Sequence, residues 1–138
     1  MVSVKQDDGT ESPVPDRLTS TSAADQDLPN PDGLFDALSS RLRRQTLFYL
    51  LEEPETTIEE LADVLAGWRA TESGPVGPTE RERIALELRH VHLPRLDGAT
   101  LVEYDSVGGD VGLCDISESV RELVQFAHTY EQTVEGSP

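Results

Sequence analysis

The order of apolar patterns between Leu34 and Ile116 constrains the fold of this chain more than any other feature. Leucines and phenylalanines recur at helical spacing over Leu34–Glu53, which predicts a first helix there. Thr57 begins a Thr-x-x-Glu capping box, so we expect a second helix to start at this residue. Its apolar face ends in a glycine-containing stretch, and we expect the helix to stop near Gly67 or shortly after Trp68.

A long connection and then a third helix follow. The segment Gly67–Pro78 reads as a loop because it contains several Gly and Pro residues; either the second helix extends through Ala70 or the loop is an insertion. Thr79 is the expected cap of the third helix, with a glutamate at the capping-box position. The inward stripe of this helix is predicted to be Ile84, Leu88 and Val91, with Leu86, Leu93 and Leu96 as a second row. Pro94 predicts a kink or the last regular turn, because proline removes a helical hydrogen bond.

Two short apolar runs come next. Thr100–Tyr104 and Val111–Ile116 are predicted strands, joined by a loop centred on Gly108-Gly109. A last helix is expected from Ser117 or Ser119 through about Tyr130, followed by a frayed tail. Its inward residues are predicted to be Val120, Leu123, Val124 and Ala127.

Three helices followed by a β-hairpin predict a mostly α fold with a small hairpin wing, an α+β winged helix-turn-helix. We expect one such domain over residues 31–131, preceded by a disordered acidic tail over residues 1–30 and followed by a tail over residues 132–138. In helix-turn-helix domains the recognition helix enters the major groove of duplex DNA. The same order of elements also serves as a dimerisation or protein-docking module, so the fold alone leaves both functions open.

The charge distribution decides how an acidic chain could approach DNA. The formal net charge is −16, and Lys5 is the single lysine. Residues 34–53 and 79–97 are each formally neutral, so the first and third helices are the least acidic parts of the chain. An acidic, lysine-poor composition is typical of proteins from salt-loving archaea, where salt screens the repulsion. The alternative is an ordinary acidic protein with an acidic tail.

Compartment follows from what the sequence lacks. One cysteine excludes an internal disulfide. No apolar run approaches the length needed to cross a bilayer, and the first residues have no signal-peptide core. We therefore expect a cytoplasmic protein without a membrane partner.

Parts of the chain resemble a known class of regulators. LFDALSSRLRRQTLFYLLEEPETTIEELADVLA resembles the first two helices of ArsR-type winged-helix regulators, and HLPRLDGATLVEYD resembles their segment from the recognition helix into the wing. The whole, over about residues 34–130, is similar to a haloarchaeal family of small winged-helix domains with no assigned function, in which a VHLP-x-L segment (here Val91–Leu96) precedes the wing. Gly98-Ala99-Thr100 departs from that pattern before the first wing strand. The resemblance implies that the third helix faces DNA.

On that implication, five residues are candidates for DNA contact: Arg81, Arg83, Glu87, Arg89 and His90. Arg83 and Arg89 could contact phosphates or a guanine edge, while Glu87 could accept from a cytosine amino group. The alternative is a solvated helix in which Glu87 pairs with Arg83 four residues away. The expected wing tip holds aspartates and no base, so it is not predicted to grip phosphate.

Other chemistries are not predicted. His90 and His92 are two residues apart on a helix and so cannot share a metal, and Cys114 reads as a small buried hydrophobe. We find no catalytic motif, and expect no enzyme, metal, cofactor or small-molecule ligand. The last helix could form a homodimer through Val120, Leu123, Val124, Ala127 and Tyr130, or could only close its own domain. Target genes, any effector and the sign of regulation stay open.

Overall fold

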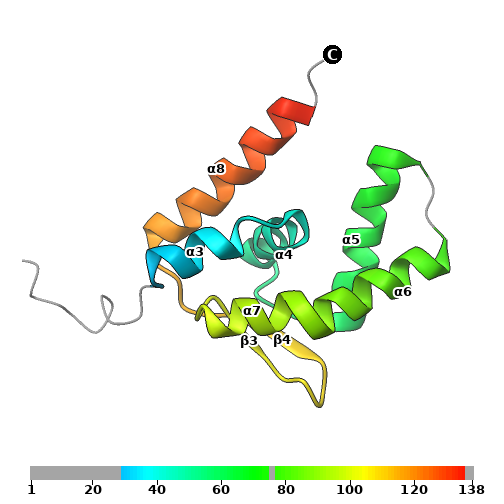
Figure 1. Ribbon diagram of the computed structural model, residues 1–138, viewed down its shortest axis with the longest axis horizontal. Helices are drawn as coiled ribbons and strands as arrows, with labels where there is room; N and C mark the ends of the chain where they lie inside the picture. The colour runs from blue at the N-terminus through cyan, green and yellow to red at the C-terminus, as the bar shows by residue number, and fades with distance from the viewer. Residues whose placement is uncertain (1–28, 75–76, 136–138) are drawn as a thin grey trace, which may run out of the picture.

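A computed structural model describes residues 29–74 and 77–135 of the chain (Figure 1). This part is mostly helical, with one small antiparallel sheet, and so has the predicted α+β character. Most of the predicted N-terminal tail lies outside the described residues. The elements are α3 (Pro31–Ala37), α4 (Arg41–Glu52), β2 (Glu55–Thr57), α5 (Ile58–Ser73), α6 (Pro78–Glu87), the π-helix η1 (Leu88–His92), α7 (Leu93–Gly98), β3 (Val102–Tyr104), β4 (Asp110–Leu113) and α8 (Glu118–Glu135).

The prediction of one helix over Leu34–Glu53 was wrong, because the chain breaks between α3 and α4. Leu38 ends α3, and Ser40 caps α4 by accepting a hydrogen bond from the Arg43 backbone N–H at 3.4 Å. Serine hydroxyls compete with the helical backbone for hydrogen bonds, which favours a cap over a continuous helix. The break turns the chain so that α3 and α4 follow different axes (Figure 1).

The Thr57 cap was predicted correctly, since its hydroxyl accepts from the Glu60 backbone N–H at 3.2 Å. The expected end of the second helix was too early. Of the two alternatives, extension is right: α5 continues to Ser73, which leaves a connection of only a few residues. Thr79 was wrongly expected to cap the third helix; α6 begins at Pro78, whose fixed φ angle suits the first helical position and needs no side-chain cap.

Pro94 does not end the third helix, because a π-turn precedes it. The Leu93 backbone N–H bonds to the Leu88 carbonyl five residues back, and α7 then begins with Pro94 in its first turn. The wider turn accommodates the missing N–H and the proline ring that a regular α-helix would not. One extra residue per turn also shifts the inward face. His92 is buried and Val91 is exposed, contrary to the predicted stripe, whereas Ile84 and Leu88 are buried as expected.

The sheet contains a strand that the sequence did not predict. β2 pairs antiparallel with β4, and β4 pairs with β3, so the strand order is β2-β4-β3. Thr56 lies opposite Val111, and Glu103 lies opposite Gly112. Three residues are too few for an alternating pattern to be recognisable in the sequence.

The strand β3 starts later than predicted because the chain leaves α7 through a left-handed residue. Thr100 has a φ of 61°, a conformation that β-branched residues rarely adopt. The Leu101 N–H bonds to the Leu96 carbonyl and the Thr100 N–H bonds to the Asp97 carbonyl, both at 3.0 Å. This is the hydrogen-bond pattern of a Schellman C-cap. Leu96 and Leu101, the residues at its two ends, are both fully buried. The departure at Gly98-Ala99-Thr100 is therefore a helix cap.

The core lies between α4, α5, the α6–η1–α7 segment and the sheet. Its fully buried side chains include Leu47, Leu50, Leu61, Leu65, Ile84, Leu88, Leu93, Leu96 and Leu101. α8 packs against α4 and buries its residues Val120 and Val124. Ser117 caps this helix, as predicted. It extends to Glu135, so the tail expected after Tyr130 is helical over that stretch. No helix in the described ranges is long and apolar enough to cross a membrane.

Candidate functional site

The candidate DNA-contacting residues lie on α6 and η1, which form one continuous helical segment with α7 beside the β3–β4 hairpin (Figure 1). Ile84 and Leu88 anchor this segment in the core. The same segment carries Leu86 and Val91, which are exposed although both are large and apolar.

Two of the predicted arginines are engaged within the protein. Arg81 of α6 pairs with Asp63 of α5 and donates to the Glu59 backbone carbonyl at 3.1 Å. The hydrogen bond to Asp63 raises the pKa of Arg81 above its usual value. Arg81 therefore holds α6 against α5, and it would have to leave Asp63 to reach a phosphate.

Arg83 is exposed, but carboxylates flank it on its own helix. It donates to Glu80 at 2.7 Å and to Glu87 at 2.9 Å. The structure thus contains the Arg83–Glu87 ion pair that the sequence offered as the alternative to DNA contact. The hydrogen bond from Arg83 lowers the pKa of Glu80, so this carboxylate stays ionised beside the arginine. Such a pair is weak in water, and Arg83 can exchange it for another anion.

Arg89 and His90 are the two candidates whose side chains have no hydrogen-bond or ion-pair partner within the described ranges. Both lie on the π-turn η1. Arg89 lines a hollow of about 330 Å³ between η1, the start of α5 and the tip of the β3–β4 hairpin, together with Thr57, Ser106 and Gly109. Since its guanidinium has no partner within the described ranges, Arg89 is the side chain best placed to bind an external anion.

A buried arginine, which the sequence did not single out, holds η1 in place. Arg43 of α4 donates to Nδ1 of His92 at 3.0 Å and to the Ala37 backbone carbonyl at 3.1 Å. Since an arginine can only donate, Nδ1 of His92 must accept, and the ring proton lies on Nε2, 3.4 Å from Glu87. Burial lowers the pKa of His92, which keeps the ring neutral. In the sequence, Arg43 lies in an arginine run that looks like a solvated helix face.

The tip of the β3–β4 hairpin carries acidic and apolar side chains rather than basic ones. The Asp105 carboxylate accepts from the Val107 backbone N–H at 3.0 Å, and Gly109 adopts a φ of +84° that the turn requires. Val107 at the tip is almost fully exposed. Asp105 is therefore part of the turn itself, as well as a negative charge on the hairpin.

α8 presents an uncovered apolar stripe that differs from the predicted dimer face. Val120 and Val124 are buried in their own domain. Phe126, Tyr130 and Val134 are spaced four residues apart and are 66%, 60% and 53% exposed. The rings of Phe126 and Tyr130 stack with centroids 6.3 Å apart. Of the predicted dimer residues, Tyr130 is the one on this stripe.

The two histidines near the third helix and the single cysteine have different surroundings. His90 is exposed and His92 is buried, so the two histidines do not share a face, as predicted. Within residues 29–74 and 77–135, no three His, Cys, Asp or Glu side chains are grouped to hold a metal ion. Cys114 is half-buried rather than fully buried, and desolvation raises the pKa of its thiol.

Comparison with known proteins places the chain in one family. The model of the family described as "Domain of unknown function (DUF7344)" matches residues 35–112, which is more than half of the chain and covers α4, the sheet, α5, α6, η1 and α7. No curated protein and no solved structure matches the chain. The matched range includes all five candidate DNA-contacting residues and excludes α8. The chain therefore belongs to the DUF7344 family.

Proposed function

We propose that this protein is a winged helix-turn-helix regulator that binds duplex DNA through α6 and η1. The observation that carries the proposal is the strand order β2-β4-β3 combined with the order helix, strand, helix, helix, strand, strand. Winged-helix domains have this connectivity, in which the strand between the first two helices joins the wing. The resemblance of the sequence to ArsR-type regulators and to a haloarchaeal winged-helix family supports the same reading.

The proposed contact surface is narrower than the sequence predicted. Arg89 and His90 are the candidates without a partner in the described part of the chain, and Arg83 can join them by releasing Glu87. Leu86 and Val91 would supply apolar contacts of the kind that recognise a thymine methyl group. Arg81 is assigned to α5–α6 packing. Each neutralised phosphate contributes about −0.9 to the slope of log K against log salt, so a slope of about −2 is expected for two contacts.

The DNA affinity of so acidic a chain should depend only weakly on salt. Its net charge of −16 opposes non-specific attraction to DNA, so binding depends on close contacts at salt concentrations that screen the repulsion. We propose that the protein acts in a cytoplasm rich in salt, as its composition and single lysine indicate.

The test is crosslinking and sequencing of DNA bound to the tagged protein in its native salt, for the wild type, Arg89→Ala and Arg95→Ala. Arg95 is the matched control, because it is an exposed arginine on α7 that pairs with Asp36 at 3.0 Å, away from the proposed contact surface. We expect sharp peaks with a shared motif for the wild type and for Arg95→Ala, and their loss with Arg89→Ala.

Two results would contradict the proposal. A flat profile for the wild type would reject DNA binding. Peaks that survive Arg89→Ala would reject this contact surface while leaving DNA binding in place.

A second function, association of two copies through α8, is favoured by the exposed stripe of Phe126, Tyr130 and Val134. In an antiparallel pair of α8 helices centred on Tyr130, Phe126 of one copy would lie opposite Val134 of the other. Arginines offset part of the negative charge beside the stripe: Glu131 accepts from Arg44 at 2.8 Å, and Glu135 accepts from Arg41 at 2.9 Å. Two acidic copies can therefore approach at this stripe with less repulsion than elsewhere.

Sedimentation velocity of Phe126→Glu and Gln125→Glu separates this function from simple closure of the domain. Both variants add one negative charge to an exposed position of α8, but only Phe126 lies on the stripe. We expect a dimer for the wild type and Gln125→Glu, and a monomer for Phe126→Glu. A monomeric wild type at all concentrations would reject the dimer.

A further inference from the structure

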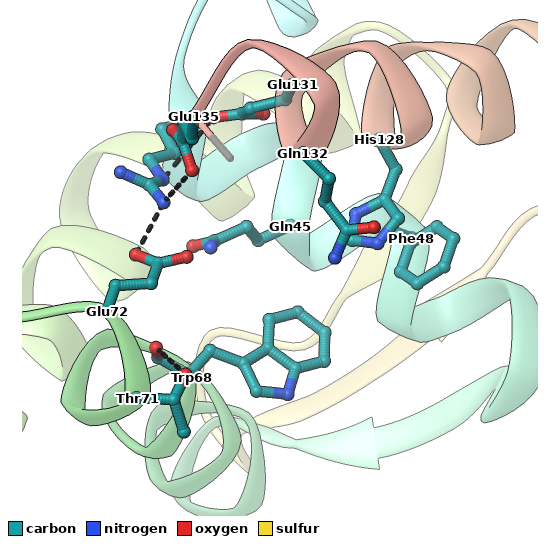
Figure 2. Close-up of a pocket in the computed structure, with 10 residues that line it drawn as sticks. Gln45, Phe48, Trp68, Thr71, Glu72, His128, Glu131, Gln132 and Glu135 are labelled. Carbon is teal, nitrogen blue, oxygen red and sulfur yellow. Dashed lines mark hydrogen bonds and ion pairs between the residues drawn. The ribbon is translucent and has the colours of Figure 1, made fainter. Parts of the chain in front are cut away.

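A cavity between α4, α5 and α8 has the chemistry of a small-molecule site (Figure 2). Its volume is about 300 Å³, within the range of ligand pockets. Three rings form its apolar wall: Phe48 from α4, Trp68 from α5 and His128 from α8. Phe48 and His128 stack with centroids 3.6 Å apart and planes 11° apart. Trp68 is held by an edge contact with Tyr49, whose ring centroid is 6.2 Å away.

The rim of the cavity has more negative than positive charge. Arg41 is the one arginine or lysine among the described residues that line it, and it pairs with Glu72 of α5 and with Glu131 and Glu135 of α8. Figure 2 shows Glu72 of α5 and Glu135 of α8 at the same end of the cavity. Arg44 also pairs with Glu131 from outside the lining. Even with both arginines counted, three carboxylates leave the rim negative.

Two amides add hydrogen-bonding capacity that the protein does not use. Gln45 from α4 and Gln132 from α8 line the cavity, and neither side chain has a hydrogen-bond partner among the described residues. Figure 2 shows the Gln45 and Gln132 side chains on one side of the cavity and Trp68 on the other. Each amide can donate and accept, so a bound molecule could be oriented by both.

We propose that this cavity binds a planar organic cation. Aromatic faces attract cations through their quadrupoles, and a negative rim adds attraction for positive charge and repulsion for anions. Flat shape matches the ring-lined wall, because stacking needs parallel planes. The sequence predicted no ligand because Trp68, Phe48 and His128 come from three separate helices.

A ligand in this cavity would link the position of α5 and α6 to that of α8. Trp68 and Glu72 belong to α5, which packs against α6, whereas His128 and Gln132 belong to α8. A ligand held by both helices would change the position of α5 relative to α8, and with it the position of α6. This regulatory consequence rests on the proposed DNA binding; the binding of the cation does not.

The experiment uses the fact that Trp68 is the only tryptophan of the chain, so its fluorescence reports on this cavity alone. The full chain is titrated with N-methylquinolinium, with 1-methylnaphthalene as the neutral isostere and 2-naphthoate as the anion. Free N-acetyltryptophanamide corrects for collisional quenching. We expect saturable quenching by the cation, with at least tenfold weaker binding of the other two compounds.

Glu72→Gln is the diagnostic variant and Glu122→Gln is its control. Both remove one carboxylate, but Glu122 is an exposed residue of α8 that does not line the cavity. We expect Glu72→Gln to lower the affinity for the cation at least fivefold and Glu122→Gln to leave this affinity unchanged. Calorimetry with Trp68→Leu, checked for folding by circular dichroism, should show loss of binding.

Three outcomes would overturn the cavity assignment: quenching that does not saturate, equal affinity for cation, neutral isostere and anion, or equal affinity in both glutamate variants. The regulatory part is tested separately by titrating target DNA with and without the cation. An unchanged DNA affinity at saturating cation would reject regulation but not cation binding in the cavity. Absence of DNA binding in both conditions would reject the proposed function and would likewise leave cation binding unaffected.

Discussion

Replacement of Arg43 by methionine tests whether the buried arginine holds the π-turn in place. Arg43 is only 6% exposed, and its guanidinium reaches four acceptors: the carbonyls of Ala37 and Asp36, the Ser39 hydroxyl and Nδ1 of His92. The contacts connect the α3–α4 break with η1. Methionine has similar length and fills the space, but it can donate nothing.

The expected loss follows from which acceptors stay buried. The carbonyl of Ala37 and Nδ1 of His92 would lose their donor inside the protein, whereas the Asp36 carbonyl and Ser39 are near the surface and can bind water. Each orphaned buried acceptor costs about 1–3 kcal/mol. Burial of the guanidinium, which lowers the pKa of Arg43, offsets part of this when the charge is removed. We therefore expect Arg43→Met to lower the free energy of unfolding by about 3 kcal/mol.

Urea unfolding, followed by circular dichroism and by Trp68 fluorescence, measures the change. Arg95→Met is the matched control, because Arg95 is 55% exposed and makes one surface ion pair with Asp36. Such a pair contributes about 0.5 kcal/mol. If both variants lose the same stability, the buried contacts of Arg43 contribute nothing beyond a surface charge, and the argument for a clamp on η1 is refuted.

Two further predictions concern pH and backbone strain. His92 is buried against Arg43, and its neutral Nδ1 accepts from that arginine; Arg95 also disfavours the protonated ring, while Glu87 favours it. Because burial first of all lowers the pKa of His92 below the ordinary value of 6.5, its contribution to stability is complete above that pH and is lost as the pH falls through the lowered pKa. Below pH 6.5 the free energy of unfolding should therefore fall less steeply with decreasing pH in His92→Gln than in the exposed control His90→Gln. Equal slopes in the two variants would show that His92 is not the group that titrates. Thr100→Gly should raise the free energy of unfolding by about 1 kcal/mol, because a β-branched residue is strained at a φ of 61°. The same substitution at Ala99, whose φ is −89°, should lower it, and a destabilised Thr100→Gly in thermal melts would show that the cap is unstrained.

Local signals in the sequence were enough for several elements. Thr57 caps α5 and Ser117 caps α8, since a capping hydroxyl and the N–H it serves lie within one helical turn. The hairpin around Gly108-Gly109 could be predicted for a similar reason, because its turn needs the positive φ of Gly109. Ile84 and Leu88 showed the core side of the third helix, since periodicity identifies a buried face before its partner is known.

The candidate sites depended on contacts between distant segments, and there the sequence was insufficient. Asp63 is 18 residues from Arg81, and nothing near either residue indicates that they pair. Four similar arginines and histidines therefore looked equivalent on the third helix, although only Arg89 and His90 are left unpaired. The π-turn, the strand β2 and the three rings of the cavity were hidden for the same reason. Short-range hydrogen bonds and apolar periodicity involve residues that are near each other in the sequence and can be predicted from it. The partner of a charged side chain and the wall of a cavity depend on how distant helices pack, which only the tertiary structure determines.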